Sequence, residues 1–149
     1  MKKILIAVMM LAVLLLPAWS YSSKLEEKLF YNLGHFGASF LYQTYFSIGM
    51  VSDAWTYNTY KPEDAKTILN TNVTFLETSR KLLTELTDFS INIDDRKTFF
   101  EMISIVDDLK SEAEYMLKYI TSRNKADVDT YDRFRQSAWA KIAKLMDIK

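Results

Sequence analysis

Apolar residues recur at helical spacing along most of the chain. Between residues 65 and 89 they follow alternating steps of three and four, and three leucines widen the stripe on one side. Such a stripe lies on one face of an α-helix and is broader than a coiled-coil seam. Two further stripes of this kind occupy residues 99–120 and 128–145. The predicted core-facing residues are Ala65, Ile68, Asn72, Phe75, Ser79, Leu82, Leu86 and Phe89 with Leu69, Leu76 and Leu83; Phe99, Ile103, Val106, Lys110, Ala113, Leu117 and Ile120 with Met102, Leu109 and Met116; and Val128, Tyr131, Arg135, Ala138, Ile142 and Leu145.

Few residues interrupt these patterns. The chain has three glycines and two prolines. Pro62 suits the first turn of a helix, where Glu63 and Asp64 lie at the positive end of the helix dipole. We expect helices at about residues 23–55, 62–88, 95–121 and 128–147, with Asp94 and Asp127 as candidate N-caps. Because the connections are short, neighbouring helices should be antiparallel, and the predicted fold is an all-α, up-down-up-down four-helix bundle.

The predicted first helix differs from the others because residues 29–52 include no charged side chain. Such a helix is buried on most sides, either as the most enclosed helix of the bundle or through an outer face that forms a homo-oligomer interface. Membrane association through residues 29–52 is the weaker alternative, since Asn32 and Gln43 are poorly suited to a membrane span. Gly34 and Ala38 allow close packing of another helix, or a gap that holds a ligand.

Residues 1–20 have the pattern of a cleavable signal peptide. Lys2 and Lys3 precede an apolar run over residues 4–16, and Pro17 is expected to break the helix before a cleavage site after Ser20. The remaining chain, residues 21–149, has the length of a single domain. The chain has no cysteine, which excludes disulfides and thiolate chemistry. This combination predicts a periplasmic or secreted protein and fits a bacterial envelope.

The distribution of charge and of catalytic residue types points away from several function classes. The chain has 19 basic and 19 acidic residues without a basic run, which argues against a nucleic-acid partner. His35 is the only histidine, and the motifs for zinc, di-iron and covalent haem ligation are absent, so we predict no metal and no cofactor. Without a Ser-His-Asp or Cys-His combination, we predict that the protein is not an enzyme.

Three residues are candidate ligand-binding residues: His35, Asn72 and Arg135. Arg135 falls in an apolar stripe, so its guanidinium must pair or reach water, and Asp53 is the partner that residue type suggests. Such a pair either fixes helix register or belongs to a site that recognises a carboxylate or phosphate. The acidic residues at positions 107, 108, 112 and 114 are expected to form a solvated surface.

Aromatic residues supply a candidate interaction surface, comprising Tyr42, Trp55, Tyr57 and Tyr60. The alternative is that the aromatic residues near the first turn cap the open end of the bundle. The overall pattern resembles that of generic periplasmic four-helix bundles, such as ligand-sensing and cytochrome-like domains, without a shared motif. We predict an exported, non-enzymatic helical bundle that acts through protein–protein contacts or self-association. The alternative is a small-ligand or cofactor-binding bundle with a site between helices near His35 and Arg135.

Overall fold

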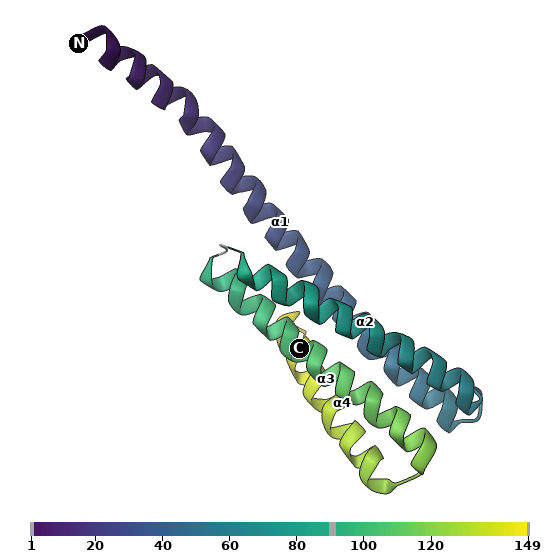
Figure 1. Ribbon diagram of the computed structural model, residues 1–149. Helices are drawn as coiled ribbons and strands as arrows, with labels where there is room; N and C mark the ends of the chain where they lie inside the picture. The colour runs from purple at the N-terminus through teal and green to yellow at the C-terminus, as the bar shows by residue number, and fades with distance from the viewer. Residues whose placement is uncertain (1, 90–91, 149) are drawn as a thin grey trace. The chain divides into compact units, whose positions relative to one another are not determined.

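The protein is all-helical in the part of the chain that the structure describes. The computed structural model describes the backbone of residues 2–89 and 92–148 and the side chains of residues 24–89 and 92–148. Four helices follow one another along these residues, with no strand among them: α1 (Lys2–Thr56), α2 (Pro62–Asp88), α3 (Ile93–Ser122) and α4 (Lys125–Leu145) (Figure 1). The predicted all-α architecture with four helices is confirmed, and the packing of the helices is consistent with a bundle.

The chain divides into two units, residues 1–35 and 36–149, which are described separately. The first unit is the N-terminal part of α1, which begins at Lys2 rather than near residue 23 and includes Pro17. Leucine, alanine and methionine, which are frequent in residues 4–16, favour helix. The predicted signal peptide lies outside the residues whose side chains are described, so it stays a prediction. No helix in the described part of the chain is long and apolar enough to cross a membrane.

The helix ends of the second unit follow local sequence signals. Pro62 begins α2 with Glu63 and Asp64 in the first turn, as predicted. The N-cap of α3 is Asn92 rather than Asp94, because the Asn92 side chain reaches the backbone N–H of Asp95 at 2.8 Å. Asn124, rather than Asp127, caps α4 in the same way. The predicted caps are therefore wrong by two or three residues, because in each case an asparagine earlier in the sequence accepts a hydrogen bond from an N–H group of the first turn.

The core of the second unit receives apolar side chains from all four helices, and α3 contributes the largest share. The buried residues are Ala38, Leu41, Ile48, Val51 and Trp55 of α1; Ala65, Leu69 and Leu76 of α2; Phe99, Met102, Ile105, Val106, Leu109, Ala113, Met116 and Ile120 of α3; and Tyr131, Ala138 and Ile142 of α4. Gly37 lets the side chain of Met102 pack closely against α1, since a Cβ at position 37 would lie 3.1 Å from the sulfur of Met102. The outer face of α1 stays open, with Phe36, Phe46 and Met50 exposed. In the described residues α3, rather than α1, is the most enclosed helix.

The buried face of α2 differs from the predicted one. Phe75, Leu82 and Phe89, which are seven residues apart along the predicted stripe, are exposed, whereas Leu69 and Leu76 are fully buried. The sequence contains two adjacent apolar lines on this helix, and the position of its neighbours decides which one is covered. The line that includes Leu69 and Leu76, which widens the predicted stripe on one side, is the one that packs in the core.

Candidate functional site

The most unusual polar contact in the core is an ion pair between α3 and α4. Nη1 of Arg135 donates a hydrogen bond to Oε1 of Glu112 at 2.7 Å. The Glu112 side chain is 0 % exposed, whereas that of Arg135 keeps limited access to solvent. The predicted partner, Asp53, is exposed instead. The prediction of Glu112 on a solvated surface is also wrong, because its position on α3 aligns with the buried residues Leu109 and Met116.

A glycine of α1 makes room for this ion pair. A Cβ built at Gly49 would lie 2.6 Å from Nη1 of Arg135 and 2.7 Å from its Cζ, closer than real Cβ atoms approach other groups. Nη1 of Arg135 also donates to the carbonyl of Tyr45 at 3.4 Å, and the guanidinium carbon lies 4.2 Å from the centre of the Tyr45 ring. The guanidinium therefore contacts α1, α3 and α4 together, and it fills the volume that a side chain at position 49 would occupy.

The environment of Glu112 shifts its protonation equilibrium. Burial raises the pKa of Glu112 to about 7, although the hydrogen bond and the charge of Arg135 oppose this shift. The negative charges of Asp108 and Asp132 raise it further. Oε2 of Glu112 is buried and has no hydrogen-bond partner among the described residues, so the pair is only half satisfied.

Further polar groups lie close to this pair. Burial raises the pKa of Tyr131 to about 12, while a hydrogen bond with Ser52 opposes the shift. The hydroxyl of Ser52 donates to the sulfur of Met116 at 3.4 Å.

No group of three or more His, Cys, Asp or Glu residues in the described part of the chain could hold a metal ion. The guanidinium of Arg135 thus links α4 to α3 through Glu112 and to α1 through the Tyr45 carbonyl.

The other two predicted ligand-binding residues lie elsewhere. Nδ2 of Asn72 donates to Oγ of Ser47 at 3.2 Å, in a partly buried contact between α2 and α1. His35 is exposed and packs edge-on against Tyr31, with 4.4 Å between ring centres. His35 belongs to the first unit, whereas Asn72 and Arg135 belong to the second. Asn72 and Arg135 share no partner in their hydrogen bonds, so the structure does not join the three residues into one site.

The predicted aromatic surface contains residues in quite different environments. Trp55 is only 5 % exposed, with its ring edge-on to Tyr119. Tyr57 is 79 % exposed and Tyr60 is also exposed. Tyr42 is half-buried and contacts the rings of Phe46 and Trp139. The role of these aromatic residues in an interaction stays a prediction.

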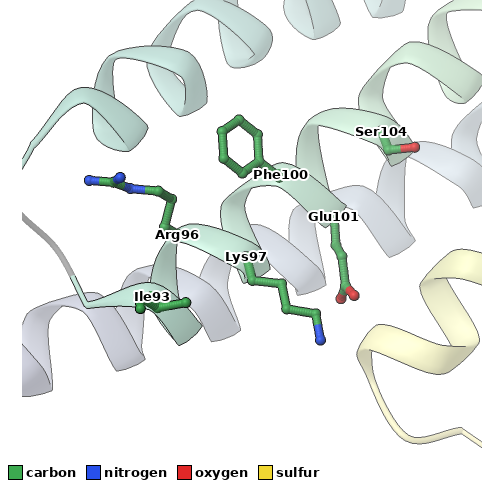
Figure 2. A pocket seen from close by; sticks show the side chains of 6 residues that line it. All are labelled: Ile93, Arg96, Lys97, Phe100, Glu101 and Ser104. Atoms are coloured by element: carbon green, nitrogen blue, oxygen red, sulfur yellow. The ribbon is translucent and has the colours of Figure 1, made fainter.

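A shallow hollow of about 540 Å³ lies over the first three turns of α3. Six residues on one face of the helix line it: Ile93, Arg96, Lys97, Phe100, Glu101 and Ser104 (Figure 2). The core-facing stripe of residues 99–120 did not predict this feature, since the hollow lies on another face of the helix. The signal was the second apolar line of α3, in which Ile93 and Phe100 are seven residues apart.

Comparison with known proteins identifies no relative: no family model, no curated protein and no solved structure matches the chain.

Proposed function

We propose that this protein is an exported, non-enzymatic up-down-up-down helical bundle that acts through protein–protein contacts or self-association. The topology is supported by two cross-helix pairs, Glu77–Lys110 at 2.8 Å and Arg80–Asp107 at 2.8 Å, whose order along α2 is opposite to that along α3. Export is supported by the pattern of residues 1–20, and it would place the bundle in the periplasm or outside the cell.

The observation that carries the proposal is the exposed apolar surface of the hollow on α3. Ile93 is 85 % exposed and Phe100 is 55 % exposed. Single exposed apolar residues are ordinary on protein surfaces, but here two large ones lie on the same helical face and line the same hollow. A partner that covered this hollow would remove both apolar side chains from water, which supports a contact at this place.

The geometry favours this function over a small-ligand site near His35 and Arg135. The guanidinium of Arg135 is held by Glu112 and by the Tyr45 carbonyl. The space beside Gly49 is filled by the guanidinium itself. A carboxylate or phosphate ligand would have to displace a buried carboxylate from its hydrogen bond, which is costly.

Site-specific photo-crosslinking tests the proposal. A photoreactive phenylalanine analogue replaces Phe100 in the full chain, and a second variant carries it at Thr121, an exposed position of α3 outside the hollow. We expect a discrete adduct from position 100 and none from position 121. The adduct should identify either a second copy or another protein, and binding should then be reproduced with the purified partner.

Native mass spectrometry of the same exported sample reports whether residues 1–20 have been removed and whether the protein self-associates. A strictly monomeric protein that gives no adduct from either position would refute the proposed function. Recovery of the uncleaved chain would refute the export component alone.

A further inference from the structure

The hollow on α3 is shallow and open, and residues of this one helix line it. Its six residues are spaced three, one, three, one and three apart, so they form one stripe along the axis. From Ile93 to Ser104 the stripe is about 16 Å long, which is about three helical turns. An amphipathic helix buries anchors over a similar length when it binds a groove through positions i, i+3 or i+4, and i+7.

The neighbours of α3 leave this part of the helix open. Nζ of Lys144, in the last turn of α4, lies 3.2 Å from Oε1 of Glu101. The earlier turns of α3, which include Ile93 and Lys97, lie beyond this ion pair. Figure 2 shows α4 on the side toward which Glu101 extends and α2 on the opposite side, with the hollow over α3 between them. A further helix could therefore lie along α3 without displacing a packed neighbour.

The charges beside the apolar residues indicate the chemistry of the occupant. Arg96 and Lys97 extend from the two edges of this face, Arg96 on the side of α2 and Lys97 on the side of α4 (Figure 2). Among the described residues, the one hydrogen bond of the Arg96 side chain goes to the carbonyl of Phe89, at 3.4 Å. Glu101, the acidic residue of the hollow, is paired with Lys144. The two remaining cations are thus available to carboxylates on both sides of an apolar anchor.

From this complementarity we propose that the hollow binds an amphipathic helix of a partner protein, which inserts apolar side chains over Ile93 and Phe100 and places acidic side chains against Arg96 and Lys97. This inference rests on the proposed function and specifies the partner of the same site. A lipid surface fits less well, because recognition of anionic lipid usually takes four or more basic residues, and two, Arg96 and Lys97, line the hollow.

The test uses two synthetic amphipathic helical peptides of about 18 residues, each with one leucine stripe of the i, i+3, i+4, i+7 type. One carries glutamates beside the stripe and the other carries lysines at the same positions. Fluorescence anisotropy measures the binding of each labelled peptide to the full-length protein. We expect the acidic peptide to bind roughly ten-fold more tightly or better, with the preference weakening in high salt.

Variants assign the binding to the hollow. Lys97→Glu should abolish the preference between the two peptides, because Arg96 then stands against a new carboxylate, whereas the matched control Lys118→Glu, at an exposed position of the same helix, should leave it unchanged. Phe100→Ala should weaken both peptides by removing the apolar contact. Circular dichroism verifies that each variant is folded, and since these side chains are exposed we expect it to be.

Two results would overturn the inference. One is equal binding of both peptides to the unmodified protein, and the other is equal effects of Lys97→Glu and Lys118→Glu. Binding to vesicles of phosphatidylglycerol and phosphatidylcholine without peptide binding would assign the hollow to a lipid surface instead. If the peptides do not bind while position 100 still gives a protein adduct, the proposed function stands and only the helical, acidic partner is wrong.

Discussion

Replacing Arg135 with methionine should destabilise the protein in a manner that depends on pH. The substitution keeps a long apolar stem but removes the charge that faces Glu112, which is fully buried and already has one oxygen without a partner. Removal of one partner from a buried ion pair typically costs about 3–5 kcal/mol. Because Arg135 is itself partly open to solvent, we expect a loss near the lower limit, about 3 kcal/mol at pH 8.

The dependence on pH follows from proton binding by Glu112. Its pKa is about 7 in the folded protein, above the ordinary value of 4.5, so between these values the folded state binds more protons than the unfolded state. The contribution of this group to the free energy of unfolding therefore falls as the pH rises from 4.5 to 7. Arg135→Met removes a cation that lowers this pKa. The decrease in the free energy of unfolding therefore continues to higher pH in this variant. The cost of the substitution should be smaller at pH 5, where Glu112 is neutral, than at pH 8, and the linkage limits the difference to about 1.4 kcal/mol.

Urea denaturation followed by far-UV circular dichroism at pH 5 and pH 8 measures this difference. The matched control is the double variant Glu112→Gln/Arg135→Met, which has no buried charge and should recover most of the stability lost at pH 8. The reasoning would be refuted if Arg135→Met cost the same at both pH values. It would also fail if the double variant were no more stable than the single one at pH 8.

Three further predictions concern the same bundle. Gly49→Ala should reduce the free energy of unfolding by about 1–3 kcal/mol, because the guanidinium of Arg135 must move. Gly37→Ala should reduce it less in the same urea assay, because the side chain of Met102 can shift. Equal reductions in the two variants would contradict the role assigned to Gly49. Glu112→Gln should flatten the dependence of melting temperature on pH between 4.5 and 7, and an unchanged profile would show that another group titrates there. Asn92→Ala should reduce the free energy of unfolding by about 1 kcal/mol through loss of the N-cap of α3, whereas an unaltered denaturation midpoint would argue against the cap.

The candidate sites were only partly predictable from the sequence. The position of Arg135 in an apolar stripe correctly indicated that it needs a partner, because a buried guanidinium cannot stay unpaired. That the partner is Glu112 was not predictable, since Glu112 follows Asp107 and Asp108 in a segment that reads as a solvated acidic face. The hollow was not predicted for a similar reason. Phe99 and Phe100 are adjacent on one helix, so they point in different directions and cannot both face the core. Phe99 belongs to the predicted core-facing stripe, whereas Phe100 belongs to no predicted feature.

The sequence by itself indicated an all-helical chain with four helices, because local interactions determine where helices form. Three features act within one or two helical turns: the spacing of apolar residues, the small number of glycines and prolines, and Pro62 at a helix start. Their effect therefore does not depend on contacts between helices. Only the tertiary structure decided how each helix is rotated about its axis. On α2 it covered Leu69 and Leu76 and left Phe75 exposed, and on α3 it buried Glu112 against Arg135. The physical reason is that neighbouring apolar lines on one helix are nearly equivalent in local energy, so the rotation is set by packing against helices that are distant in the sequence.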